Sequence, residues 1–185
     1  MELMSASERS HEEQVEYWNG PGGNHWVARF EHMDRVLAPF TDMLLARAGV
    51  RDGTTAVDIG CGCGGTTQIL AELVGLTGRV IGLDVSEPML RIAAERLSAI
   101  PCVELVRADA ARYAFAEGCA DVLLSRFGVM FFGDPTAAFA NLRRALKPDG
   151  RFVFVCWQSI DQNPWMNIPL QAVSAHVPAG PQPDP

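Results

Sequence analysis

The stretch Ala56-Val57-Asp58-Ile59-Gly60-Cys61-Gly62-Cys63-Gly64-Gly65 joins an apolar, β-branched run to a loop rich in glycine. The apolar run over residues 54–59 predicts a buried strand. The glycines allow the backbone to turn sharply and allow a ligand to approach the main chain closely. Residues 66–74 have a helical pattern that stops at Gly75, and a helix start offers free N–H groups and a positive dipole end. The stretch therefore predicts a strand, a ligand-binding turn and a helix.

The alternation of strand and helix continues along the chain. Apolar runs predict further strands over 79–84, 103–107, 121–125 and 151–157. Ser86 with Pro88 indicates the start of a helix that includes 89–97, and Asp134-Pro135 that of a helix reaching about 146. Pro148-Asp149-Gly150 is typical of a turn. This order favours an α/β fold with a doubly wound, mostly parallel sheet, in which ligands bind at the carboxyl ends of the strands.

Helices are also predicted ahead of the first strand. We expect a short helix over 12–18, a second from Asn24 to 38 that Pro39 ends, and a third over 40–48 that closes at Gly49. Residues 158–176 include a helical pattern near 165–175, and residues 178–185 contain four prolines, which predicts an extended tail.

Composition excludes several classes of protein. The chain has 185 residues, 48% of them hydrophobic and 20% charged, which is typical of one globular unit. Its formal net charge of −7 argues against a strongly basic nucleic-acid binder. Its apolar runs are too short for a membrane span, and its first residues lack the features of a signal peptide. Five cysteines, an odd number, favour a reduced cytoplasm, and the Cys61-x-Cys63 spacing predicts no metal site.

Three aspartates, Asp58, Asp84 and Asp109, lie at the ends of the first three predicted strands. Asp84 lies 24 residues after Gly60, where a carboxylate can accept two hydrogen bonds from a ribose diol. Asp109 follows the third strand and can accept a hydrogen bond from an exocyclic amine such as that of adenine. Taken alone, Gly60-x-Gly62-x-x-Gly65 also satisfies the dinucleotide fingerprint, so an NAD-dependent oxidoreductase is one alternative.

Four motifs in order resemble those of a known family. The stretch from Asp58 to Gly64 resembles motif I of the class I S-adenosylmethionine-dependent methyltransferases, which have a Rossmann-like fold. Residues 81–86 with Met89-Leu90, residues 107–110 and residues 142–151 resemble the family's next three motifs. The resemblance covers about residues 52–157 and is strongest to the branch similar to the ubiquinone- and menaquinone-biosynthesis methyltransferases.

The resemblance implies S-adenosylmethionine as the cofactor, with S-adenosylhomocysteine as its product and no metal. The glycine loop would pass under the methionine part of the cofactor, while the three aspartates would orient its amino group, hold its ribose hydroxyls and read its adenine amine. Carried over residue by residue, the implied cofactor contacts are Asp58, Gly60, Cys61, Gly62, Gly64, Asp84, Val85, Met89, Asp109, Ala110 and Ser125.

The catalytic residues are not identified by the sequence. Ser125 and Arg126 follow or end strand four and would face the reacting group, while His25 and His32 are candidates for a general base. In the family, residues ahead of the first strand cover the cofactor, which makes Trp18, Trp26 and Arg29 candidates for a lid.

The resemblance divides the chain into three regions. Residues 1–50 would form an N-terminal helical lid segment, 51–157 the Rossmann-like cofactor domain, and 158–185 a partial substrate-cap insertion with a proline-rich tail. The family sheet has seven strands, yet the sequence predicts five, so strands six and seven are expected to be missing and the chain to be a C-terminally truncated methyltransferase. An exposed edge at strand five would favour pairing with another chain, for instance in a homodimer.

The leading functional hypothesis is methyl transfer to a small, apolar or aromatic molecule by in-line displacement. The alternatives are a non-catalytic module that binds S-adenosylmethionine, or a truncated methyltransferase, and, more remotely, the NAD-dependent oxidoreductase.

Overall fold

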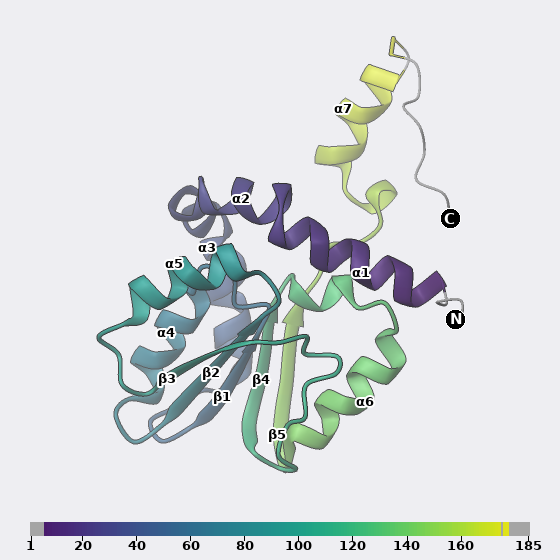
Figure 1. The fold of residues 1–185 in the computed structure, drawn as a ribbon. Helices are drawn as coiled ribbons and strands as arrows, with labels where there is room; N and C mark the ends of the chain where they lie inside the picture. Colours follow the sequence, from purple (N-terminus) through teal and green to yellow (C-terminus); the bar gives the residue numbers. More distant parts are fainter. Residues whose placement is uncertain (1–5, 175, 178–185) are drawn as a thin grey trace.

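A computed structural model describes residues 6–174 and 176–177 of the chain. Its centre is a five-stranded sheet in the order β3-β2-β1-β4-β5, and every neighbouring pair in it is parallel (Figure 1). This arrangement confirms the predicted doubly wound, mostly parallel α/β fold. The strands are β1 (Thr55–Ile59), β2 (Arg79–Asp84), β3 (Val103–Arg107), β4 (Ala120–Arg126) and β5 (Leu146–Val155).

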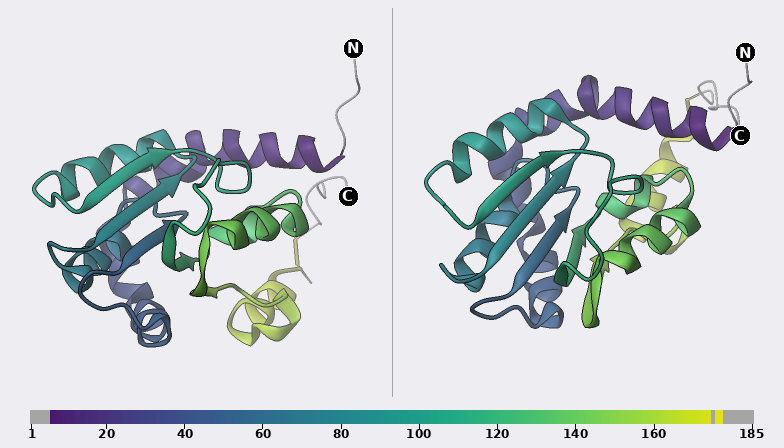
Figure 2. Two further views of the ribbon diagram at one scale, coloured as in Figure 1. Left: turned by 90° about the horizontal axis from the view of Figure 1, so that it is seen from below. Right: turned by 60° about the horizontal axis from the view of Figure 1, so that its bottom comes forward.

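Helices cover both faces of this sheet (Figure 2). In chain order the helices are α1 (Ala6–Asn19), α2 (Pro21–Val27), α3 (Phe30–Ala48), α4 (Gly65–Val74), α5 (Glu87–Leu97), η1 (Gly128–Phe131), α6 (Pro135–Ala145), η2 (Ile160–Gln162) and α7 (Pro164–Ser174). Helix α1 lies across the carboxyl ends of the strands, whereas α7 projects away from the body of the molecule (Figure 1). Among the described helices, none is both long and apolar enough to cross a bilayer.

Alternate residues of the central strands fill two separate cores. Val57 and Leu123 lie in a core that includes Leu142 of α6. Ala56 and Leu124, their neighbours in sequence, lie in the other core with residues of α3 and α4. Because both faces are buried, the central strands are apolar throughout, which explains the continuous hydrophobic runs in the sequence.

The strand order places a crevice beside β1. The chain passes from β1 outward to β2 and β3, then returns to β4 on the other side of β1. The loops after β1 and β4 touch at this point, because a Cβ on Gly60 would lie 2.8 Å from the Cα of Gly128. Gly60 also has a φ of +70°, so a side chain there would be strained as well as obstructed. This reversal of strand order is where ligands bind in such sheets.

Pro39 does not end a helix as predicted. Helix α3 continues through it from Phe30 to Ala48. A proline inside a helix removes one backbone hydrogen bond and obstructs the preceding turn. Leu37 and Leu44, on either side of Pro39, are both buried, and their packing compensates for that local cost.

Two further local predictions differ from the structure. Asn24 lies inside α2 instead of capping a helix, and the break between helices falls at residues 28–29. Pro148-Asp149-Gly150 belongs to β5, but as an irregularity: Leu146 pairs with Ala120 while Arg151 pairs with Val122. The turn-forming residues therefore bulge out of the ladder. The proline-rich tail predicted at 178–185 lies outside the described residues.

The N-terminal helices are joined to the sheet domain at the start of α5. The Ser86 hydroxyl donates to the Trp18 carbonyl at 2.6 Å. The Asn19 side chain donates to the Val85 carbonyl and accepts from the Glu87 backbone N–H, both at 3.0 Å. These bonds fix the end of α1 above β2.

Replacing Ser86 tests this junction. Ser86→Ala removes the bond to Trp18 and the side-chain cap of α5, so the free energy of unfolding should fall by about 1–2 kcal/mol in a urea titration. The control is Ser98→Ala at the exposed far end of α5, whose hydroxyl bonds only within its own helix and should cost far less. Equal losses in the two variants would contradict a structural junction at Ser86.

Candidate functional site

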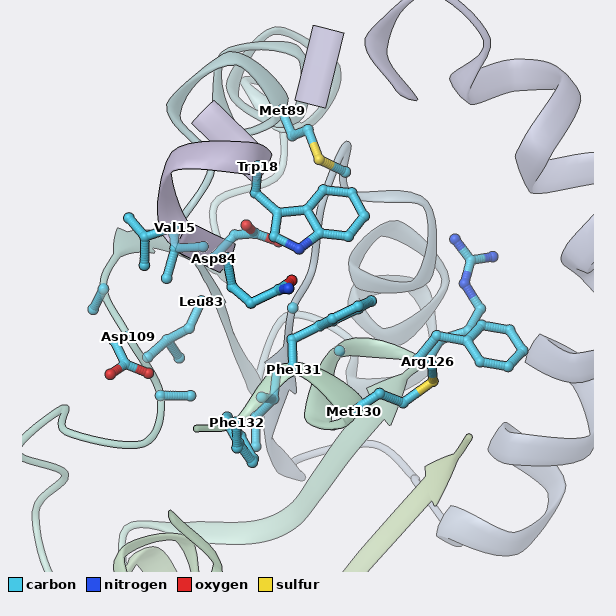
Figure 3. A pocket seen from close by; sticks show the side chains of 18 of the residues that line it. Val15, Trp18, Leu83, Asp84, Met89, Asp109, Arg126, Met130, Phe131 and Phe132 are labelled. Carbon is cyan, nitrogen blue, oxygen red and sulfur yellow. The ribbon is translucent and has the colours of Figure 1, made fainter. Parts of the chain in front are cut away.

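A cavity of about 200 Å³ opens at the carboxyl ends of the strands, beneath α1. Asp109 lies on one side of it and Arg126 on the opposite side, with Asp84 and Trp18 between them (Figure 3). The sheet order explains this row: Asp109 follows β3, Asp84 ends β2, Gly60 follows β1 and Arg126 ends β4. Residues that are far apart in sequence therefore line one groove in the order of the strands.

The glycine loop is bound to the end of β2. The backbone N–H groups of Gly60 and Cys61 both donate to the Leu83 carbonyl, at 2.8 and 3.0 Å. The N–H of Gly62 donates to Oδ2 of Asp84 at 2.8 Å. The loop is therefore fixed in a shape that brings the main chain of Gly60 to the cavity wall.

Asp84 has a defined orientation at the centre of the row. Its Oδ1 accepts from the Ser86 N–H and its Oδ2 from the Gly62 N–H, each at 2.8 Å. Burial raises the pKa of this carboxyl, while its bonds to backbone N–H groups oppose that shift. An ionised carboxylate offers about four acceptor positions, so Asp84 can still accept from hydroxyl groups of a ligand in the cavity.

Asp109 holds an unused acceptor at one end of the cavity. Its Oδ1 accepts from the Ala111 N–H at 2.9 Å. Its Oδ2 is buried and accepts no hydrogen bond among the described residues, although Nε2 of His11 lies 3.4 Å away and Nε of Arg112 3.9 Å away. A buried acceptor without a donor is costly, so this atom is prepared for a donor such as an amine.

Asp58 lies behind the cavity wall and not in it. The side chain is buried, and its Oδ2 accepts from the Thr67 hydroxyl at 2.7 Å. This bond joins β1 to the first turns of α4. Burial, the largest effect, raises the pKa of Asp58 to about 6.

Ser125 is also turned away from the cavity. Its buried hydroxyl donates to the Ile59 carbonyl at 2.8 Å and accepts from the N–H groups of Gly128 and Val129, at 3.1 and 3.2 Å. These bonds join the end of β1 to the start of η1. The side chain thus shapes the loop after β4, a different place from the reacting face expected from the sequence.

The two cysteines of the loop are buried. Burial raises the pKa of the Cys61 thiol well above its usual value and that of Cys63 to about 12. A neutral thiol is a poor nucleophile and a poor metal ligand. Within residues 6–174 and 176–177, no group of three or more His, Cys, Asp or Glu side chains is arranged to hold a metal ion.

The structure brings together only part of the site expected from the sequence. The expected cofactor residues that line the cavity are Gly60, Asp84, Val85, Met89, Asp109 and Ala110, and Trp18, Trp26 and Arg126 line it too. The remaining candidates lie outside its lining: Asp58, Cys61, Gly62, Gly64, Ser125, His25, His32 and Arg29. His25 and His32 are exposed, and His25 of α2 contacts Arg29, the residue just before α3.

Comparison with known proteins decides the family. A sequence profile described as "Methyltransferase domain" matches residues 57–154, which is more than half of the chain. The chain belongs to the methyltransferase family. The matched segment covers β2, β3 and β4 in full, β1 from its third residue and most of β5.

Individual relatives agree with this assignment. The methyltransferase domain is similar to a demethylmenaquinone methyltransferase of Staphylococcus aureus, with 39% identity over 105 residues that cover 57% of this chain and 44% of that protein. The chain thus spans less than half of the length of the curated relatives it matches. Together with the solved structures, this similarity supports the expected membership of the class I S-adenosylmethionine-dependent methyltransferases.

Two solved structures share the fold. A methyltransferase of Aquifex aeolicus, described as SAM-dependent, superposes with a TM-score of 0.59 at 24% identity, covering 64% of each chain. Phosphoethanolamine N-methyltransferase 2 of Haemonchus contortus, solved with S-adenosyl-L-methionine, also gives a TM-score of 0.59, at 26% identity over 70% of this chain and 32% of that one.

Several residues that line the cavity were not expected from the sequence. His11 and Val15 precede Trp18, which the sequence offered as a lid candidate, by seven and three residues on α1, so one face of that helix meets the cavity. Phe127 and Phe131 come from the segment after β4. The helical spacing of His11, Val15 and Trp18 indicates that they share one face of α1, but only the position of α1 over the sheet shows that this face meets the cavity.

The end of the cavity beside Arg126 is aromatic. The rings of Phe127 and Trp157 stack with centroids 4.7 Å apart and an angle of 12° between their planes. Phe131 meets Trp18 edge to face at 5.2 Å. Phe127 has a φ of +66°, which is rare and strained for a bulky side chain. The packing of these rings therefore stabilises an aromatic wall of the cavity and compensates for the strained backbone of Phe127.

Asp58→Asn tests the pH dependence expected from the buried carboxyl. Because the folded-state pKa of about 6 is higher than the ordinary 3.8, Asp58 contributes stability below about pH 4 that is lost as the pH rises through 6. The variant cannot titrate there. The free energy of unfolding of the variant minus that of the native chain should thus rise between pH 4 and pH 7, by on the order of 3 kcal/mol.

Urea unfolding at pH 4, 5, 6 and 7 measures this difference, from which the titration of groups that do not interact with Asp58 cancels. Asp42→Asn, which removes an exposed carboxylate on α3, is the control and should show no comparable rise. A difference that stays constant with pH would show that Asp58 titrates normally.

Proposed function

We propose that this chain forms the cofactor-binding part of an S-adenosylmethionine-dependent methyltransferase that transfers a methyl group to a small-molecule acceptor by in-line displacement. The observation that carries the proposal is the row Asp109, Asp84 and Gly60 at the carboxyl ends of adjacent strands, inside one cavity. The family membership and the relatives named above support the same activity.

The adenosine part of the cofactor fits the first half of the row. The unpartnered Oδ2 of Asp109 would accept a hydrogen bond from the adenine amine. Val15, Leu83 and Ala110 offer apolar walls around a flat ring. Asp84, already oriented by two backbone N–H groups, would accept hydrogen bonds from the ribose hydroxyls.

The amino-acid part would continue over Gly60, toward the aromatic end. When bound, the cofactor supplies a methyl group activated by its sulfonium charge. The chain's own contribution is to orient this group and to exclude water. Orientation of two reactants accounts for about 7–11 kcal/mol of a barrier when the fit is good. Phe127, Phe131 and Trp157 would provide the walls against which the acceptor is placed.

The aromatic walls favour an apolar or planar acceptor of small size. The formal net charge of −7 argues against a nucleic acid as the substrate. A reduced cytoplasm is the location that we propose, because the odd number of cysteines is compatible with free thiols.

Helices α1 and α2 would act as the lid of the site. They contribute His11, Val15, Trp18 and Trp26 to the cavity wall. The junction at Ser86 holds the end of α1 beside Asp84, so the lid and the ribose site are mechanically linked.

The structure disfavours the dinucleotide alternative. In NAD-binding folds the pyrophosphate sits at the N-terminus of the helix that follows the glycine loop. Here the Asp34 carboxylate lies against Gly65, the first residue of that helix. A non-catalytic module that binds the cofactor is the second candidate, and turnover of the cofactor separates it from an enzyme.

Calorimetric titration with S-adenosylhomocysteine, and with NAD as the control ligand, tests the proposal. The first should bind and the second should not. Asp84→Ala should weaken S-adenosylhomocysteine binding by at least tenfold, because a hydrogen bond to a charged group contributes about 1.5–3 kcal/mol. Asp149→Ala, an exposed aspartate in the β5 bulge, is the matched control and should bind normally. A folded native chain that binds neither ligand would refute the proposed cofactor.

A further inference from the structure

The loop that carries Asp109 is joined to the sheet domain at both of its ends. At its start, the Ala108 N–H donates to the Asp84 carbonyl at 3.0 Å. At its far end, the buried side chain of Phe115 packs in the core that residues of α6 also enter. Residues 109–113, between these two points, form a turn outside any helix or strand. Their conformation therefore depends on other contacts.

The orientation of the Asp109 carboxylate depends on the backbone of this turn. Its Oδ1 accepts from the Ala111 N–H, two residues further along the chain, at 2.9 Å. The Asp109 carbonyl accepts from the N–H groups of Arg112 and Tyr113, at 3.0 and 2.8 Å. Because these donors all belong to the turn, a change in its backbone would redirect the carboxylate.

A side chain of α6 fixes the turn from outside. Nδ2 of Asn141 donates to the Ala110 carbonyl at 3.2 Å and to the Tyr113 carbonyl at 2.9 Å. An amide nitrogen carries two hydrogens, so one side chain can donate to both carbonyls. Ala110 lines the cavity beside Asp109, whereas Asn141 does not. Asn141 thus acts on the wall of the cavity from behind it.

The residue type at position 141 is unfavourable for the helix itself. Asn141 lies inside α6, which runs from Pro135 to Ala145. Asparagine is a weak helix former, and alanine at an interior position would stabilise the helix more. The two hydrogen bonds to the turn offset this cost, so the asparagine serves the loop and not the helix that contains it.

We propose that Asn141 is a positioning residue: its amide fixes the turn after β3 and thereby holds the Asp109 carboxylate at the cavity, where it selects a nucleoside with a donor amine. This inference rests on the proposed function for the identity of the nucleoside. The effect of Asn141 on the turn is tested without any ligand.

Competition between two ligands tests the selection. S-inosylhomocysteine differs from S-adenosylhomocysteine by a carbonyl oxygen in place of the adenine amine, so it offers Asp109 an acceptor instead of a donor. The native chain should prefer S-adenosylhomocysteine by at least about tenfold, the ratio expected for a hydrogen bond to a charged group. In Asn141→Ala this preference should fall below about threefold, because the carboxylate is no longer held in place.

The ratio of the two affinities separates positioning from stability, because both ligands are measured on the same variant. Val74→Ala, a truncation in the other core, destabilises the fold without touching the turn and should keep the native ratio. Arg143→Ala is the matched control on α6, removes an exposed side chain and should also keep it. Asn141→Gln retains the amide on a longer stem and should lose less of the preference than Asn141→Ala.

Amide hydrogen exchange provides the readout without ligand. The N–H groups of residues 111–113 should exchange at least about fivefold faster in Asn141→Ala than in the native chain, because two hydrogen bonds that fix the turn are lost. The N–H groups of β4 should change much less. Val74→Ala should instead accelerate exchange in β4 at least as much as in the turn. Asn141→Gln gives the same comparison, in smaller degree, if Asn141→Ala does not fold.

The outcomes are separable. Turn exchange that rises no more than β4 exchange, or a ligand preference that stays native in Asn141→Ala, would overturn the proposal. Equal binding of the two nucleosides to the native chain would also overturn it, because Asp109 would then not select the amine. If S-adenosylhomocysteine fails to bind the native chain while Asn141→Ala loosens the turn, the proposed function fails and the positioning of the turn by Asn141 stands.

Discussion

The hydrogen bond from the Gly62 N–H to Asp84 is the contact on which most of the candidate site depends. It joins the glycine loop to the end of β2, while the second oxygen of the same carboxylate accepts from Ser86 at the start of α5. One side chain therefore fixes two loops and faces the cavity itself. A carboxylate oriented in this way binds a ligand without first losing conformational freedom, which is the benefit of preorganisation.

The same contact extends to the N-terminal helices. The N–H of Ser86 donates to Asp84 and its hydroxyl donates to the Trp18 carbonyl, so α1 is held over the cavity by a residue that is itself bonded to Asp84. On the other side, Ser125 joins β1 to η1, and the cavity closes between these two junctions. The site is thus built by short polar bonds between loops, while the two apolar cores hold the sheet beneath it.

The sequence predicted the parallel sheet well because each central strand is buried on both faces and reads as a continuous apolar run. It also predicted that Asp84 and Asp109 lie at the same edge of the sheet, because the carboxyl ends of parallel strands meet there. The prediction that a helix ends at Pro39 was wrong, because the packing of Leu37 and Leu44 outweighs the local cost of proline in a helix. Side-chain direction at Ser125, and the meeting of His11 with Asp109, depend on tertiary contacts that no local pattern encodes.

The distribution of tryptophan gives the molecule a built-in optical reporter. Of the four tryptophans, Trp18, Trp26 and Trp157 line the cavity, and Trp165 lies on the exposed helix α7. Three of the four indole rings therefore lie where a ligand in the cavity would contact or dehydrate them. Entry of a nucleoside at one end and of an acceptor at the other would alter different rings, so the order in which the two arrive is open to observation by light alone, without any label.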